Sequence, residues 1–405
     1  MEVIIIMNNK KLLIFVILSF LIVLIEFFYI IYNKSFNKSE SIYFVGLNAL
    51  AVDSKNNYVA VGSNNDNVNH YEKASVSLYN SKKEKTLEKL YNIGYNSSFF
   101  DVLIDGDDII AVGNYEKSLS EHESSVRRAL IVKYDKNGNV LFEKDFKVLD
   151  NSKFTGIIKV DDYYYVTGQS IYSNTNVGSN EGGALIAKYD KDGNMLWYKI
   201  YGNNKESLFN DLIFADNYLY AVGNYENNYA IIVKYDLDGN VISYNDYKIT
   251  DELGFTSIVN LENNIYVSGA LKTGDNDTDA MIVRYDLDCN YIDQVSYNGI
   301  GKERFNRLII DNDNNIIAIG TMMSSITHSK KNYGDYNYDG IIAKYMNDLK
   351  EIDSVSYGDE RNDFFTDIKL IDGNYLIVGY SSYEDGSYMS KFINYSSALK
   401  VLGVD

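Results

Sequence analysis

The amino-acid sequence predicts an all-β protein, a seven-bladed β-propeller of four-stranded antiparallel blades. A phrase ending in glycine recurs seven times, at Gly62, Gly113, Gly168, Gly223, Gly269, Gly320 and Gly379. The steps between these glycines are 51, 55, 55, 46, 51 and 59 residues. A period near fifty with no helix-length pattern inside it is typical of repeated small sheets. Residues 42–405 are 364 positions, and 364/7 is 52 per unit, which suits four short strands and their turns.

The fourth unit shows the four strands of a blade most clearly. Apolar, β-branched and aromatic residues fill the segments 209–215, 218–223, 230–235 and 241–247, each bounded by Asn, Asp or Gly. In the third segment, Ala230 and Ile232 face one way while Ile231 and Val233 face the other, so both faces are apolar. Radial stacking of the units buries both faces, and closure of the ring removes the exposed ends.

The turn between the third and fourth strands has the most regular sequence. It reads Lys-Tyr-Asp-Lys-Asp-Gly-Asn over 188–194, and the glycine supplies the left-handed position of a bulged hairpin. Cys289 replaces this glycine once. Hairpin chemistry explains Asp190, Asp192 and Asn194 without calcium, because the spacing of an EF-hand loop and its closing acid are missing.

The repeat sequence resembles that of a known family. Residues 184–197, continued by Tyr201-Gly202 and by 218–223, resemble the bacterial SBBP-type seven-bladed propeller repeat. The likeness covers all seven units, although only Trp197 keeps the tryptophan that this family carries in the fourth strand. The resemblance implies a cell-envelope module with no common catalytic centre. Closure of the last blade is open at this point, since either 42–45 or 398–402 could form its outer strand.

The N-terminus predicts a membrane anchor. Residues 12–33 are almost wholly apolar and long enough to span a bilayer, with Lys10 and Lys11 before them and Glu26 as the one internal charge. We expect a short cytoplasmic tail at 1–11, a transmembrane signal anchor at 12–33, a linker at 34–41 and the propeller at 42–405. The propeller would then be displayed outside the cytoplasm at the cell membrane. A cleaved signal peptide is the alternative.

Composition narrows the class of function. A net charge of −18 argues against nucleic-acid binding, because that function requires a basic surface. Cys289 is the only cysteine, so there is no redox pair, and the sequence lacks the nucleophile elbow, zinc-protease and phosphate-loop motifs. We therefore expect no enzyme, no cofactor and no metal.

Two sets of residues are candidate ligand-binding positions at the mouth of the central channel. The first lies two places after the phenylalanine of each first strand, and its charged members are Asp101, Asp211, Arg307 and Asp367. If the first strands line the channel, these side chains converge; they either bind a polar ligand or cap backbone N–H groups and pair with one another. The second set comprises His70, His122 and His328, all in loops between second and third strands, where imidazoles could bind a ligand or merely be solvated.

These features predict a membrane-anchored, surface-exposed propeller that acts as a non-catalytic binding or scaffolding module for a protein or glycan. Tyr- and Asn-rich loops at the channel mouth suit such recognition. An envelope hydrolase or lyase that uses the polar ring is the alternative. Assembly of envelope proteins by strand addition at a blade edge is a third hypothesis.

Overall fold

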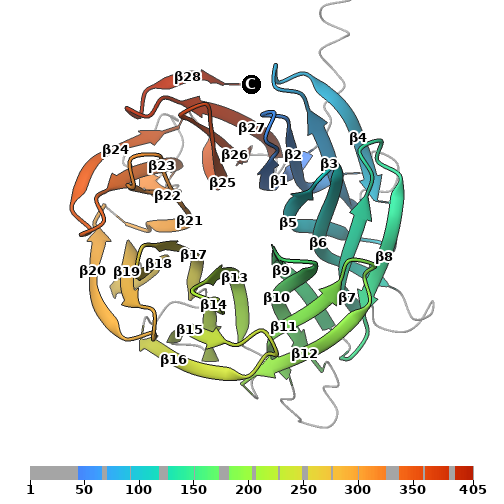
Figure 1. The fold of residues 1–405 in the computed structure, drawn as a ribbon. Helices are drawn as coiled ribbons and strands as arrows, with labels where there is room; N and C mark the ends of the chain where they lie inside the picture. Colours follow the sequence, from blue (N-terminus) through green and yellow to red (C-terminus); the bar gives the residue numbers. More distant parts are fainter. Residues whose placement is uncertain are drawn as a thin grey trace, which may run out of the picture. The chain divides into compact units, whose positions relative to one another are not determined.

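The computed structural model describes residues 44–65, 71–91, 93–117, 126–149, 151–172, 182–202, 207–226, 229–248, 254–274, 277–299, 301–324, 337–358, 361–382 and 388–404. They belong to the second of two units, Tyr43–Asp405. Seven antiparallel sheets of four strands are arranged as blades around a centre, which confirms the predicted propeller (Figure 1). The predicted anchor at 12–33 lies outside the described residues, and within them no helix has the length and hydrophobicity to cross a membrane.

Each blade is built from four consecutive strands. Blades 1 and 2 contain β1 (Phe44–Val52), β2 (Tyr58–Asn65), β3 (Glu72–Tyr79), β4 (Lys85–Tyr91), β5 (Ser97–Asp105), β6 (Asp108–Lys117), β7 (Val126–Tyr134) and β8 (Val140–Phe146). Blades 3 and 4 contain β9 (Asn151–Val160), β10 (Tyr163–Ile171), β11 (Gly182–Asp190), β12 (Met195–Tyr201), β13 (Leu208–Ala215), β14 (Tyr218–Tyr225), β15 (Tyr229–Tyr235) and β16 (Val241–Lys248). Blade 5 contains β17 (Phe255–Leu261), β18 (Asn264–Gly274), β19 (Asp277–Asp286) and β20 (Tyr291–Tyr297). Blades 6 and 7 contain β21 (Arg304–Ile310), β22 (Ile316–Ser324), β23 (Asn337–Tyr345), β24 (Glu351–Tyr357), β25 (Asn362–Ile371), β26 (Asn374–Ser382), β27 (Tyr388–Tyr395) and β28 (Val401–Val404).

Strand order within every sheet follows the chain, from an inner to an outer strand. The first strands β1, β5, β9, β13, β17, β21 and β25 surround the centre (Figure 1). In the last blade the outer strand is β28, which pairs with β27, whereas the chain near residue 44 enters the inner strand β1. The alternative that the sequence left open is therefore decided in favour of the C-terminal segment.

Apolar clusters lie between neighbouring blades, as radial stacking requires. Ala230 and Ile232 of β15 pack with Phe255 and Val267 of blade 5. Ile231 and its alternating neighbours on the same strand pack instead with blade 3. The predicted phase of this strand is confirmed, and burial of both faces is what stabilises each small sheet.

A regular pair of aromatic rings links each outer strand to the next inner strand. Tyr201 at the end of β12 lies 6.0 Å, centroid to centroid, from Phe209 in β13. Equivalent pairs, each eight residues apart in sequence, are Tyr91–Phe99, Phe146–Phe154, Tyr247–Phe255, Tyr297–Phe305 and Tyr357–Phe365. Most of these contacts are tilted or edge-on and Tyr357–Phe365 is stacked, and such ring contacts add to the burial of apolar area.

The turns after the third strands have the predicted hairpin geometry. Asp190 Oδ1 accepts hydrogen bonds from the N–H groups of Asp192 and Asn194, and its Oδ2 accepts one from the Asn194 amide. These bonds, the side-chain bond from Asn194 first, lower the pKa of Asp190. Cys289 takes the left-handed position with φ 66°, as the sequence predicted. The turn aspartate is thus engaged by its own loop.

A β-bulge in each first strand explains the recurring glycine. In β13 the register shifts between Phe209 and Asp211, so that Asn210 is the extra residue. The bulge brings the Leu208 carbonyl against β14, where a Cβ on Gly223 would lie 1.8 Å from that oxygen. A carbonyl oxygen lies 1.8–2.1 Å from the equivalent Cβ position at Gly62, Gly113, Gly168, Gly320 and Gly379. Six of the seven glycines that reveal the repeat are therefore required by the bulge of the neighbouring strand, whereas at Gly269 the nearest carbonyl oxygen lies 2.8 Å from the Cβ position.

Candidate functional site

The four charged ring residues predicted from the sequence do converge at the channel wall. Arg307 on β21 places Nη1 3.1 Å from Asp211 Oδ2 and Nε 3.1 Å from Asp367 Oδ1, while Nη2 lies 3.9 Å from Asp101 Oδ1. These acids come from β5, β13 and β25, so one guanidinium reaches three other blades. Lys369, which the sequence analysis did not single out, adds a second cation 3.0 Å from Asp367 Oδ2.

The same carboxylates satisfy backbone N–H groups of the first strands. Asp101 accepts from Val102 N–H in its own strand (2.8 Å) and from Ile157 N–H in the next blade (2.9 Å). Asp211 does the same for Leu212 (2.9 Å) and Ile258 (3.2 Å). Asp367 accepts from Ile368 (2.8 Å) and, across the ring closure, from Leu50 (2.7 Å). Ser257 Oγ accepts the remaining N–H, that of Leu308, at 3.2 Å.

Seven equivalent N–H groups, one per blade, are therefore satisfied by three aspartates and one serine. Two oxygens per carboxylate explain why three acids are sufficient for six blades. The equivalent positions in blades 1 and 3 carry Ala49 and Gly156, which have no acceptor atom in the side chain. The arrangement explains this, because the N–H groups that an aspartate there would meet already have acceptors. Buried N–H groups left without an acceptor are costly, so this ring of acceptors stabilises the channel wall.

Burial and neighbouring charges shift the pKa values of two ring carboxylates, Asp101 and Asp367. Burial raises the pKa of Asp101 to about 6; Arg307 opposes the rise and Asp211 adds to it. Burial also acts to raise the pKa of Asp367, but Lys369 and Arg307 together outweigh it and hold that pKa below its ordinary value. The difference follows distance, since the Asp367 carboxylate lies closer to two cations than Asp101 lies to one.

Of the two interpretations of the ring, the geometry favours the structural one. All six carboxylate oxygens accept backbone N–H groups, and the cations lie among them. A ligand would have to displace bonds that hold adjacent blades together. A ligand-binding role for Asp101, Asp211, Arg307 and Asp367 remains a prediction. His70, His122 and His328 lie outside the described residues.

A second ring, which the sequence analysis missed, is formed by the bulge residues themselves. Asn or Thr side chains there donate to the carbonyl of the next blade's first strand. The donors are Asn48, Thr155, Asn210, Thr256, Asn306 and Thr366, at 2.5–2.8 Å from the acceptor oxygens. A periodic Asn or Thr directly after the phenylalanine was the available signal. Blade 2 departs from it, with Phe100 in this position.

A polar cavity lies where Phe100 interrupts this second ring. Its volume is about 640 Å³, and we call it the mouth pocket. The lining residues come from blades 1, 2, 3 and 7: Asn48, Ser63, Glu72, Asn96, Ser97, Ser98, Phe100, Asn114, Glu116, Arg127, Lys153 and Tyr380. Amides, hydroxyls, two carboxylates and two cations thus share one cavity with two aromatic rings.

Some polar groups of the mouth pocket are engaged and others are not. Glu116 accepts from Arg127 Nη2 at 3.2 Å and from the Asn96 amide at 3.0 Å. In contrast, the side chains of Asn114, Lys153 and Glu72 make no hydrogen bond or ion pair with the described residues of the propeller. Burial and the nearby Glu116 raise the pKa of Glu72. Burial and the nearby Arg127 lower the pKa of Lys153.

An aromatic stack borders the mouth pocket. Phe364 lies between Tyr338 and Tyr380 with ring centroids 5.9 Å and 4.9 Å apart and the planes nearly parallel. Tyr380 and Phe364 also line a neighbouring cavity of about 430 Å³ over blades 5 to 7. Tyr380 is therefore shared by the two cavities.

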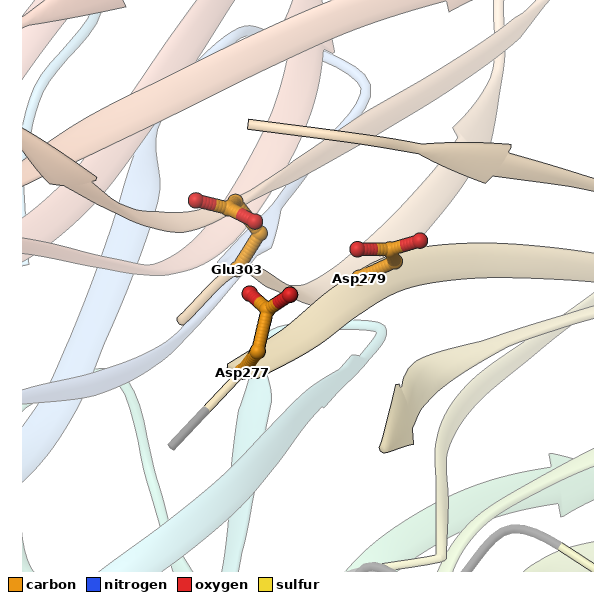
Figure 2. A group of neighbouring side chains, drawn as sticks. All are labelled: Asp277, Asp279 and Glu303. Atoms are coloured by element: carbon orange, nitrogen blue, oxygen red, sulfur yellow. The ribbon is translucent and has the colours of Figure 1, made fainter. Parts of the chain in front are cut away.

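Three carboxylates also cluster between blades 5 and 6, as Figure 2 shows for Asp277, Asp279 and Glu303. Their oxygens lie within 4.8 Å of one another. Burial raises the pKa of Asp279 and of Glu303, and Asp277 adds to both shifts. Glu303 already accepts N–H bonds from Gly299 and Gly301, so it also orders the segment before β21.

Comparison with known proteins supports the fold alone. No family model matches the chain, and no curated protein does either. Among solved structures, puromycin hydrolase is similar with a TM-score of 0.53 and 7% identity, covering 88% of this chain and 54% of that one. Sqt1 from Chaetomium thermophilum matches with a TM-score of 0.49 and 11% identity over 89% and 84% of the two chains. A neuraminidase-like protein from A/bat/Guatemala/164/2009 matches with a TM-score of 0.43 and 10% identity over 79% and 90%.

Proposed function

We propose that this chain is a membrane-anchored, surface-exposed binding module that takes a glycan in the mouth pocket. The observation that carries the proposal is the interruption of the bulge ring at Phe100. An aromatic side chain replaces a structural hydrogen-bond donor there, and a cavity of about 640 Å³ lies beside it. A ring at this position, beside a cavity lined by polar groups, could stack on a ligand.

The chemistry of the lining suits a sugar better than a protein surface. Sugar rings present hydroxyls around an edge and C–H groups on a face, which match amides, carboxylates and an aromatic side chain. Asn114 and Glu72 have unengaged polar atoms for the hydroxyls, and Phe100 and Tyr380 offer rings for stacking. A flat protein partner would not fill a concave polar cavity of this size.

The experiment is a glycan-binding screen with the full chain in detergent, comparing wild type with Phe100→Ala and Asn114→Ala. The control is Tyr244→Ala, which removes a 59% exposed ring from the outer strand β16. We expect wild type and the control to bind the same oligosaccharides, and both pocket variants to bind at least about tenfold more weakly. Equal binding by Phe100→Ala, or binding of no glycan by wild type, contradicts the proposal.

One observation favours a second candidate, an envelope glycoside hydrolase. Burial and the nearby Glu116 raise the pKa of Glu72, and two carboxyl groups that line one cavity are the residue types that glycoside cleavage uses. In that case wild type would release shorter products from a bound oligosaccharide and Glu72→Gln would not. Binding without cleavage by either protein leaves the non-catalytic module as the function.

Anchoring and location rest on the apolar segment 12–33 and are proposed with the function. We likewise propose membership of the SBBP-type family, which rests on the sequence of the repeats. Display on the cell surface would place the mouth pocket among envelope glycans.

A further inference from the structure

Lys153 has an unusual environment for a lysine. It lies near the start of β9 and lines the mouth pocket, yet its side chain is only partly exposed. Its amine makes no ion pair with any described carboxylate, although the chain has a net charge of −18. A sequestered cation is unfavourable unless an anion neutralises it.

The other charged groups of the cavity do not supply that anion. Glu116 is engaged by Arg127 and by Asn96. Arg127 lies close enough to act on Lys153 as a like charge, so two cations face the same cavity. Glu72 makes no bond to the amine. Lys153 is therefore a cation of the cavity that has no ion-pair partner among the described residues of an otherwise acidic protein.

We propose that the mouth pocket selects sugars that carry a carboxylate, with Lys153 binding that carboxylate. This inference rests on the proposed glycan-binding function. Asn114 and Glu72 would bind hydroxyls of the same sugar, and Phe100 would contact its face. Lys153 is thus a specificity-determining residue, and Arg127, already bonded to Glu116, adds charge without leaving its partner.

A carboxylate fits better than a phosphate dianion. Phosphate sites usually combine several donors, often backbone N–H groups at a helix N-terminus, and the described chain has no helix near the pocket. Glu72 and Glu116 would also repel a second negative charge. One unpaired amine matches one negative charge.

The test compares uronic-acid oligosaccharides with their methyl esters, which keep the sugar and remove the charge. Trigalacturonic acid, triglucuronic acid and the corresponding esters are titrated into the full chain in detergent. The variants are Lys153→Gln and, as a control, Lys191→Gln, which changes an exposed lysine in the β11–β12 turn. Inorganic phosphate is added as a competitor in a separate arm.

We expect wild type and Lys191→Gln to bind at least one acid about tenfold or more tightly than its ester, and Lys153→Gln to bind acid and ester equally. Phosphate should compete weakly, and the preference for acid should decline with added salt. The inference is overturned if Lys153→Gln keeps the preference, if no acid is preferred, or if phosphate binds more tightly than the acids. Equal binding of acid and ester by wild type would overturn this inference while preserving the glycan-binding function; no binding of any sugar would overturn both.

Discussion

Asp101 is the ring residue whose charge the fold favours least. Its carboxylate is buried and accepts two N–H groups, but the nearest cation, Arg307 Nη2, is 3.9 Å away. Burial accordingly raises its pKa to about 6. A group whose pKa is higher in the folded state stabilises the fold fully below its unfolded pKa, near 3.8. That contribution is lost as pH rises through the folded value.

Asp101→Asn should therefore flatten the pH dependence of stability. Between pH 4.5 and pH 7 we expect the free energy of unfolding of wild type to fall by about 2 kcal/mol more than that of the variant. Urea unfolding at the two pH values measures this difference. Asp238→Asn, in the exposed β15–β16 turn, is the control and should follow wild type. Equal slopes for wild type and Asp101→Asn would contradict the assignment.

At the residue scale, alignment of the repeats predicted which side chains converge and left open whether they bind a ligand or cap backbone N–H groups and pair with one another. Asp101, Asp211, Arg307 and Asp367 were placed correctly because each follows the phenylalanine by two residues. Their N–H partners belong to neighbouring strands and depend on the bulge, which composition does not reveal. Lys153 could not be singled out, since its lack of an ion pair is a property of the assembled cavity.

The bulge is the feature that decides the packing of the inner two strands. It moves the Leu208 carbonyl toward β14, so position 223 has no room for a Cβ. Strand phases and hairpin turns were predictable, because alternation and Asp-x-x-Gly-Asn spacing are local signals. The bulge was not, because an Asn or Thr inside a strand reads as an ordinary solvent-facing residue.

Gly223→Ala should be strongly destabilising. The new methyl group would lie 1.8 Å from the Leu208 oxygen, and both strands would have to separate, at a cost of about 2–4 kcal/mol. Gly403→Ala on β28 is the matched control, since no atom lies within 4 Å of its Cβ position. Thermal unfolding of both variants measures the difference. A melting temperature for Gly223→Ala equal to that of the control would show that the bulge can shift at no cost.

For the whole ring, the junction between blades 7 and 1 is the critical contact. The chain does not share a blade between its two ends, because β1 belongs wholly to blade 1 and β28 to blade 7. Among the described residues, the apolar cluster at this junction has six buried members: Leu47, Leu50, Tyr58, Ala60, Leu376 and Val378. The cluster between blades 1 and 2 is much larger. Polar bonds across the junction therefore matter more here than elsewhere.

Two of these bonds repeat the pattern found at the other junctions. Leu50 N–H donates to Asp367 Oδ2 at 2.7 Å, and Thr366 Oγ1 donates to the Leu47 carbonyl at 2.7 Å. Both rings of hydrogen bonds thus continue through the closure. The seven-bladed count followed from the repeat period, but how the ends join could not be read from the sequence because two segments were equally suitable.

Urea unfolding of Asp367→Ala beside Ser257→Ala tests most directly whether the ring of acids holds the blades together. Loss of Asp367 leaves the N–H groups of Leu50 and Ile368 without acceptors, removes the carboxylate paired with Lys369 and takes one of three carboxylates from Arg307, so we expect a loss of about 3–5 kcal/mol. Loss of Ser257 leaves Leu308 N–H without its acceptor and should cost about 1–2 kcal/mol. If Asp367→Ala is no less stable than Ser257→Ala, the acids do not hold the blades together.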